Sequence, residues 1–272
     1  MHKNGQKAFF QKEGYLVVEN LLSAAEVETC QAEIHRLHQF AAGQEPDAEK
    51  ERADIARQHV QREPFAKNET QGDRLPVLRK AENTRQYSDV FRDLAQHPKL
   101  IRVVQELIGQ DLLLFRSTLM FKPAFHGSSH GLHQDSAYWP MEPPNLVTVS
   151  IALNDATPEN GCFKVIPKSH LWGMQSWGHI ARQQGAELTD QKEVAKQQMD
   201  VPLSAGSALF FHSLMVHGSG PNTTPNPRNT ALYAYFSPQV RYVPQGGKPA
   251  EKTFPVVAGL GGKTELTLIA EI

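Results

Sequence analysis

The N-terminal part of the chain combines helical and extended hydrophobic patterns. A short helical pattern precedes the apolar run Tyr15–Val18, which predicts a strand because aromatic and β-branched residues suit a pleated surface. Ser23 and Glu26 have the spacing of a capping box, which predicts a helix that continues to about Leu37. A further helical segment is predicted over Val90–Ile108.

After this segment the pattern changes to short, β-rich hydrophobic runs separated by Gly, Pro, Asn and Asp. Runs of this length and spacing are typical of a β-sandwich or β-barrel. The predicted strands are Leu112–Phe121, Leu146–Leu153, Cys162–Ile166, Ser207–Phe211, Leu214–His217 and Thr230–Phe236. We therefore expect a mainly β fold with flanking helices.

Two stretches, near residues 43–63 and 181–198, are rich in charged and amide side chains and poor in large apolar ones. Segments of this kind are usually solvated helices or surface loops. Either stretch could also act as a lid over a binding pocket, because some long loops carry function. We expect a single domain over residues 1–272 that carries these two polar insertions.

Composition narrows the classes of partner. The 28 basic and 29 acidic residues leave a formal charge of −1, so no global field draws the chain to nucleic acid or anionic lipid. A small-molecule partner is favoured instead. No stretch of the sequence approaches a membrane span, and Cys30 and Cys162 are predicted to be free thiols in a reducing compartment. We therefore expect a cytoplasmic protein.

The segment His133-Gln134-Asp135 carries candidate metal ligands. Side chains two residues apart in a strand share a face, so His133 and Asp135 can approach one ion. This spacing alone is weak evidence, because the composition gives about one such His-x-acid motif by chance. With His217 as a third ligand, the set matches the facial triad of non-haem Fe(II) oxygenases. His212 competes with His217 but lacks the Gly-Ser-Gly-Pro-Asn that follows His217.

Arg228 stands eleven residues after His217 and suggests a co-substrate. A facial triad leaves coordination positions open for a bidentate 2-oxo acid and for dioxygen. The far carboxylate of such an acid needs a cation, and the planar guanidinium group suits two-point recognition of a carboxylate. The strand alternation places Arg228 on the face of Thr230 and Leu232. An inward-facing arginine of this kind favours a 2-oxo acid as co-substrate.

Five short motifs stand in order along most of the chain. They are Gly14–Val18, His133–Asp135, Asn154–Cys162, Val165–His170 and His217–Asn222, the last followed by Arg228. In these motifs the sequence resembles the phytanoyl-CoA dioxygenase family of Fe(II)/2-oxoglutarate oxygenases. The resemblance implies a double-stranded β-helix, a jelly-roll and cupin-like core with helices packed outside.

The resemblance also implies roles for individual residues. His133, Asp135 and His217 correspond to the iron ligands. Arg228 corresponds to the residue that holds the distal carboxylate of 2-oxoglutarate, with Ser219 beside it. Because Asp135 is present where halogenating relatives have a small residue, hydroxylation is implied over halogenation.

Three further residues, Thr118, Gln134 and Lys80, match family positions near the co-substrate. The expected protein is a dioxygenase that uses Fe(II) and O2, converts 2-oxoglutarate to succinate and oxidises a C–H bond of a small molecule. One alternative is a cupin-like metal-dependent isomerase or hydrolase in which Arg228 binds a substrate acid. Another is a non-catalytic binding protein. The sequence leaves open the substrate, the oligomeric state, and the choice among hydroxylation, desaturation, epimerisation and ring formation.

Overall fold

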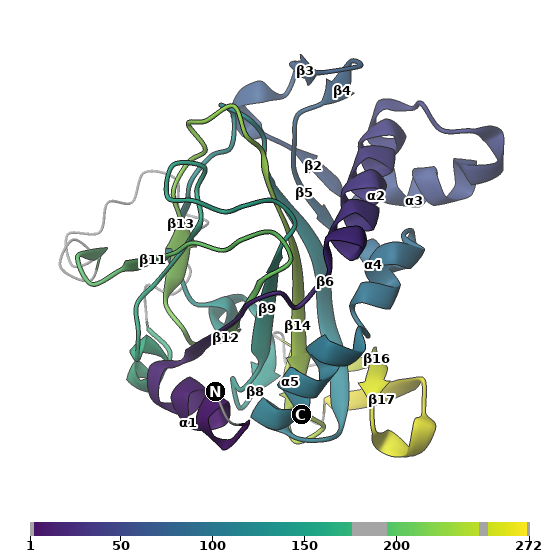
Figure 1. Ribbon diagram of the computed structural model, residues 1–272. Helices are drawn as coiled ribbons and strands as arrows, with labels where there is room; N and C mark the ends of the chain where they lie inside the picture. The colour runs from purple at the N-terminus through teal and green to yellow at the C-terminus, as the bar shows by residue number, and fades with distance from the viewer. Residues whose placement is uncertain (1–2, 176–194, 245–249, 271–272) are drawn as a thin grey trace.

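Two antiparallel β-sheets form the centre of the computed structural model, which describes residues 3–175, 195–244 and 250–270 (Figure 1). The strands of these sheets are β1 (Tyr15–Val18), β2 (Val60–Arg62), β5 (Leu78–Glu82), β6 (Leu112–Lys122), β7 (His130–His133), β9 (Val147–Ala152), β10 (Phe163–Val165), β11 (Met199–Val201), β12 (Ala208–His212), β13 (His217–Ser219), β14 (Arg228–Phe236), β16 (Ala250–Ala258) and β17 (Glu265–Ala270). Two small ribbons pair β3 (Thr70–Gln71) with β4 (Leu75–Pro76) and β8 (Met141–Glu142) with β15 (Arg241–Tyr242).

The larger sheet has the strand order β1-β12-β9-β14-β6-β16-β17, and β5 adds to β6 and β2 to β5. The smaller sheet has the order β11-β10-β13-β7. Apolar side chains of both sheets meet in one cluster, in which Leu209 and Phe211 of the larger sheet pack with Val165 and Val201 of the smaller. The mainly β, jelly-roll prediction with flanking helices is confirmed.

Helices cover the outer face of the larger sheet (Figure 1). They are α1 (Lys3–Glu13), α2 (Ala24–Ala42), α3 (Lys50–His59), α4 (Asp89–Leu94) and α5 (Pro98–Ile108). The hydroxyl groups of Tyr233 and Tyr235 on β14 donate hydrogen bonds to the carbonyls of Phe91 and Ala95, which ties the helical layer to the sheet. None of the helices among the described residues is long and apolar enough to cross a membrane.

The predicted helices form, with two changes of extent. Ser23 and Glu26 make both hydrogen bonds of the capping box, and α2 then continues to Ala42, beyond the predicted end. The segment Val90–Ile108 is not one helix, because α4 ends at Leu94 and α5 begins at Pro98. Proline lacks the N–H that a continuous helix needs and disfavours helical geometry in the residue before it.

The predicted strand Leu214–His217 is wrong in its position. The N–H groups of Leu214 and Met215 both bond back to His212, so the chain turns here and β13 begins only at His217. The other predicted strands form within two residues of their expected ends. The strand expected to carry both His133 and Asp135 ends at His133, and Asp135 begins a 3-10 helix. The C-terminal hairpin β16–β17 had no prediction.

The polar stretch 43–63 contributes more than the solvated surface that its composition predicts. It forms the short helix η1 (Asp47–Glu49), α3 and the edge strand β2. Its last residue, Glu63, is fully buried, and its Oε1 accepts a hydrogen bond from the N–H of Ser128 at 2.9 Å. The stretch therefore supports a loop of the β core. Most of the second stretch, residues 181–194, lies outside the described residues.

Candidate active site

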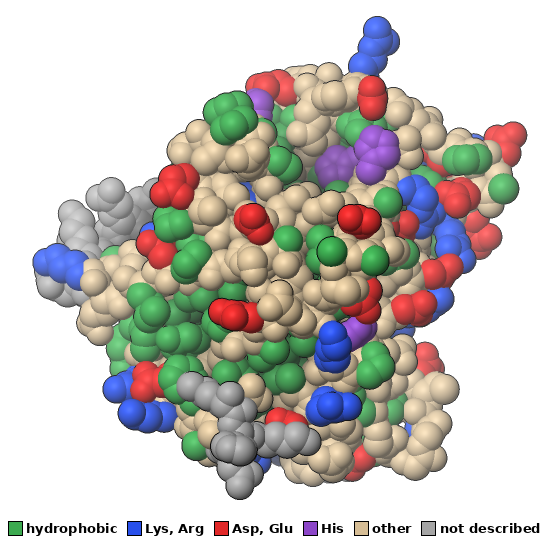
Figure 2. Space-filling model, in the orientation of Figure 1, with side chains coloured by type: hydrophobic (Ala, Val, Ile, Leu, Met, Phe, Trp, Pro, Cys, Tyr) green, Lys and Arg blue, Asp and Glu red, His purple; other side chains and the backbone are tan. Residues whose placement is uncertain are grey.

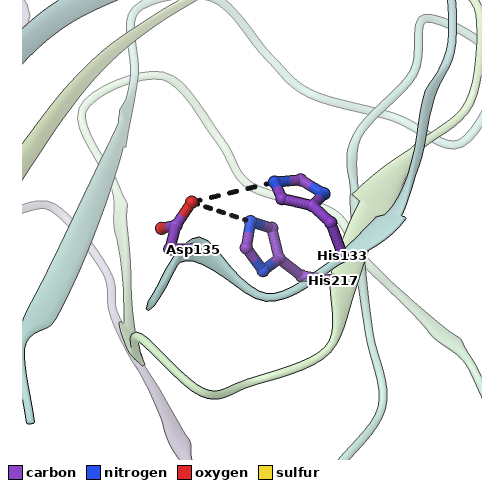
Figure 3. Close-up of side chains that lie close together, drawn as sticks. All are labelled: His133, Asp135 and His217. Atoms are coloured by element: carbon purple, nitrogen blue, oxygen red, sulfur yellow. Dashed lines mark ion pairs between the residues drawn. The ribbon is translucent and has the colours of Figure 1, made fainter. Parts of the chain in front are cut away.

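Three side chains from two strands and a short helix converge at one point (Figure 3). His133 ends β7 and His217 begins β13, directly opposite each other across the smaller sheet. Asp135 begins the 3-10 helix η4 (Asp135–Tyr138). Its Oδ1 lies 3.7 Å from Nε2 of His133 and 3.9 Å from Nε2 of His217. All three candidate ligand atoms lie within 4.8 Å of one another.

Backbone carbonyls orient both imidazole rings. The Nδ1 of His133 lies 2.9 Å from the carbonyl oxygen of Gly131, and the Nδ1 of His217 lies 2.9 Å from that of Met215. A carbonyl oxygen only accepts, so each Nδ1 carries the proton and each Nε2 presents its lone pair. Burial, reinforced by the neighbouring His217, lowers the pKa of His133 and keeps the ring neutral. Neutral imidazoles are the form that binds metal ions.

A hydrogen bond orients the carboxylate as well. Oγ1 of Thr148, on β9, donates to Oδ2 of Asp135 at 2.8 Å, which leaves Oδ1 directed at the two histidines. Both residues are buried, so water does not replace this bond. Two imidazoles and one carboxylate on a single side of a point match the donor set of a facial Fe(II) site.

We expect Thr148→Val to weaken metal binding by about ten- to a hundredfold, because outer-shell partners of metal ligands contribute affinity of that order. The substitution removes the hydroxyl group that orients Asp135 while preserving side-chain volume. Calorimetric titration with Fe(II) under anaerobic conditions measures the change. The control is Thr230→Val, because Thr230 is equally buried but makes no hydrogen bond to Asp135. Equal affinities in the two variants would contradict the role of Thr148.

Arg228, at the start of β14, is a buried cation with no acidic partner among the described residues. Its side chain is 3 % exposed, and its Nε and Nη2 have no hydrogen-bond partner within the described part of the chain. The guanidinium carbon lies 5.1 Å from the ring centre of Phe163, which itself stacks on His217 at 6.0 Å. Burial lowers the pKa of Arg228 to about 10. An unpaired buried guanidinium is costly, so this geometry calls for an anionic ligand beside the triad.

Lys122, opposite Arg228 on β6, holds the loops at this end of the site. Its buried Nζ donates to the carbonyls of Ser128 and Gly220, both at 2.6 Å. Burial first, and then the charge of Arg228, lowers the pKa of Lys122 to about 7. Gly161 packs so closely here that a Cβ would lie 2.5 Å from the Gly220 carbonyl and 2.8 Å from Cδ of Lys122. Lys122 was not among the predicted site residues, because nothing nearby in the sequence signals this contact.

A cavity of about 510 Å³ joins the triad to Arg228. Three of the predicted co-substrate residues, Ser219, Thr118 and Lys80, line it. The Oγ1 of Thr118 accepts a hydrogen bond from Nε of Arg116, and Nζ of Lys80 lies 2.9 Å from Oε1 of Glu82. These positions bring the predicted residues into one cavity, and their contact with a co-substrate stays a prediction.

Gln134 lies elsewhere. Its side chain is fully buried and does not line the cavity. Its Nε2 donates to the carbonyls of Gly173 and Leu214, and its Oε1 accepts from the N–H of Gln175. The geometry gives no support to the predicted contact with the co-substrate. Gln134 instead fastens the triad segment to the chain around residue 174.

His212 is also distant from the convergence point. Its Nδ1 accepts the N–H of Leu214, its ring lies 5.5 Å from that of His170, and it does not line the cavity. Burial lowers its pKa to about 4. Of the two competing histidines, only His217 reaches Asp135.

Comparison with known proteins places this geometry in a family. The family model described as phytanoyl-CoA dioxygenase (PhyH) matches residues 10–230. The chain belongs to the phytanoyl-CoA dioxygenase family. This match covers the triad and Arg228 and ends within β14.

Three relatives illustrate the range of the family. An ectoine dioxygenase from Nocardia farcinica is 28% identical over 264 residues, which cover 91% of this chain and 82% of the relative. EctD from S. alaskensis, solved with 2-oxoglutarate and 5-hydroxyectoine, superposes with a TM-score of 0.69 at 25% identity, covering 88% of this chain and 77% of EctD. The epimerase SnoN, solved with Fe3+, alpha ketoglutarate and nogalamycin RO, gives a TM-score of 0.67 at 26% identity, with coverage of 90% and 87%.

Proposed function

We propose that this member of the phytanoyl-CoA dioxygenase family oxidises a C–H bond of a small molecule while converting 2-oxoglutarate to succinate and CO2. It is an Fe(II)- and 2-oxoglutarate-dependent dioxygenase that uses O2, as its relatives' names and bound ligands indicate. The observation that carries this function is the unpaired, buried Arg228 in the same cavity as the His133, Asp135 and His217 triad.

Each residue has a physical task in this proposal. His133, Asp135 and His217 hold the iron, which supplies the redox chemistry that activates O2 when it is bound. Arg228 binds the distal carboxylate of 2-oxoglutarate in two-point fashion, and Ser219 adds a hydroxyl group on the same wall of the cavity. The co-substrate in turn neutralises a guanidinium group that would otherwise be buried without a partner.

Aromatic side chains line the part of the cavity beside the triad. Phe163 packs between Arg228 and His217, and Tyr138 lies 6.0 Å from the ring of His133. A dry, shaped cavity strengthens the electrostatic contacts inside it and suppresses side reactions. We propose hydroxylation in preference to halogenation, since Asp135 supplies the carboxylate ligand. We also propose a cytoplasmic location, in keeping with the free thiols Cys30 and Cys162.

Oxygen uptake tests this function directly. We expect the iron-loaded protein to consume O2 and form succinate only when 2-oxoglutarate is present, and removal of iron by a chelator to stop both. An oxygen electrode and succinate quantification provide the measurement, with pyruvate, which lacks the distal carboxylate, as the matched control acid. A protein that turns over without O2 or 2-oxoglutarate would instead be the cupin-like isomerase or hydrolase.

A further inference from the structure

The far end of the cavity from Arg228 is shaped by a β-bulge in β6. Arg116 pairs with Ala234 and Leu114 pairs with Tyr235, so Phe115 is the extra residue between two consecutive pairs. A bulge redirects side chains, and here both Phe115 and Arg116 line the cavity. Bulges of this kind are frequent next to active sites.

The charge of the cavity differs from that of the whole molecule. Basic and acidic side chains are interspersed over the face seen in Figure 2, and the chain carries a formal charge of −1. The cavity lining instead contains two acidic residues, Glu82 and Asp135, and six basic ones. The basic residues are Arg79, Lys80, Arg116, Lys122, Arg228 and Lys252.

Three of these six cations are accounted for. Arg228 is assigned to 2-oxoglutarate in the proposed function, and Lys122 is held by two carbonyls. Nη1 of Arg79 lies 3.8 Å from the buried Oε1 of Glu63. An iron(II) ion and a 2-oxoglutarate dianion carry opposite charges of equal size. Binding both therefore leaves the excess positive charge of the cavity lining unchanged.

Next to the bulge, the carboxylate of Glu82 forms ion pairs with both Lys80 and Arg116. Oε1 of Glu82 lies 2.9 Å from Nζ of Lys80 and 3.1 Å from Nη2 of Arg116. Burial opposes ionisation of Glu82, but the two cations outweigh it and lower its pKa. This group therefore carries a net positive charge, and Arg116 is its member on the bulge.

Lys252 adds a second uncompensated charge. Its Nζ lies 5.3 Å from the ring centres of Phe115 and Phe254 and 5.7 Å from that of Tyr242. No carboxylate lies within 4 Å of this ammonium group anywhere in the described ranges. Lys252 is exposed to solvent on one side, and its partial burial against the rings lowers its pKa. An anion in the cavity would pair with this ammonium group.

The strand that carries Lys252 lies beyond residues 10–230, which the family model matches. Strand β16 joins the larger sheet through Val256, opposite Leu113, and Ala258, opposite Leu112. The yellow hairpin β16–β17 in Figure 1 contains this strand. The pairing with β6 brings Lys252 to the cavity.

Aromatic rings connect these charges with the triad. The ring of Phe115 lies 4.9 Å from that of Trp139. Tyr138, which precedes Trp139 in the sequence, has its ring 6.0 Å from that of His133. All three aromatic side chains line the cavity. An apolar portion of a substrate could pack along them while its charged end stays at the bulge.

We propose that Arg116 and Lys252 form the substrate-recognition site, and that the substrate is a small organic anion with an apolar body that packs against Phe115 and Trp139. The inference rests on the proposed function, because it assumes that Arg228 is taken by 2-oxoglutarate. The substrate class, an organic anion, is inferred from Arg116 and Lys252, which line the end of the cavity opposite Arg228.

Three probes with the same phenyl group and different polar ends test this site. They are the anionic 4-phenylbutyrate, the neutral 4-phenylbutanamide and the cationic 4-phenylbutylamine. Each is titrated calorimetrically into the protein loaded with Fe(II) and saturating 2-oxoglutarate without oxygen. We expect the acid to bind about tenfold more tightly than the amide, as hydrogen bonds to charged groups allow, and the amine to bind weakest. Equal affinity for acid and amide, preference for the amine, or no binding of the acid overturns the proposal.

Variants locate the preference. Lys252→Gln and Arg116→Gln should each reduce acid affinity about tenfold while leaving amide affinity unchanged. Lys99→Gln, an exposed lysine on α5 outside the cavity, is the matched control and should keep the preference. A preference that survives both cavity substitutions overturns the assignment. A wild-type protein that shows no preference for the acid but keeps 2-oxoglutarate-dependent oxygen uptake counts against this inference alone. A wild-type protein without that uptake counts against the proposed function.

Discussion

Replacing His217 with alanine is expected to abolish tight Fe(II) binding and succinate formation together. The imidazole faces Asp135 from the strand opposite His133, and no other histidine among the described residues joins this cluster. Loss of one of three protein ligands leaves an incomplete facial site, so both metal affinity and turnover fall. Anaerobic Fe(II) titration and succinate quantification on the same preparation provide the measurement.

His212→Ala is the matched control for this experiment. His212 is the histidine that the sequence pattern makes the rival candidate, and its ring contacts His170 and Phe10 instead of the triad. The variant should keep Fe(II) binding and turnover, although a cavity in this region will lower its stability. An active His217→Ala together with a His212→Ala that cannot bind iron would show that the triad is assigned to the wrong histidine.

Arg228→Ala should raise the 2-oxoglutarate concentration needed for half-maximal succinate formation roughly a hundredfold or more. Removing one partner of a buried charge pair costs about 3–5 kcal/mol, and each 1.4 kcal/mol is about a tenfold change in affinity. Arg228→Lys should recover part of the loss, because an ammonium group keeps the charge but not the planar fork. Fe(II) affinity should stay close to that of the wild type in both variants.

Arg241→Ala is the matched arginine control, because its side chain is 73% exposed and pairs with Glu142 on the outside of the molecule. It should leave the 2-oxoglutarate dependence unaltered, as exposed ion pairs contribute little. Wild-type 2-oxoglutarate dependence in Arg228→Ala would remove the co-substrate assignment and favour the cupin-like alternative. A fall in Fe(II) affinity alone would make Arg228 a structural residue.

The features that the sequence predicted well depend on local patterns. His133 and Asp135 lie two residues apart, and the run before His217 signalled the approach to the site, so these positions could be found without a structure. The alternating pattern from Arg228 likewise placed its side chain on the inner face. Local spacing determines which side of a strand a residue occupies, and that information is present in the sequence.

The features that it missed depend on contacts between distant segments. Thr148, on β9, orients Asp135 through a hydrogen bond. Glu63, the last residue of a polar stretch that was predicted to be solvated, is buried and accepts a hydrogen bond from Ser128. Lys252 reaches the cavity only because its hairpin pairs with β6. For Gln134, adjacency in sequence to two candidate ligands suggested a contact with the co-substrate. The alternation of side chains instead directs Gln134 away from the cavity.

Because His133 pairs directly with His217, an iron ion bound by both side chains would link two strands of the smaller sheet. An ion held by both histidines joins β7 to β13, segments that are far apart in the chain and that must separate when the protein unfolds. A ligand that binds only the folded state stabilises it by about 2.7 kcal/mol when its free concentration is a hundred times its Kd. Without iron the folded state would lose this contribution, so β7 and β13 would separate more often.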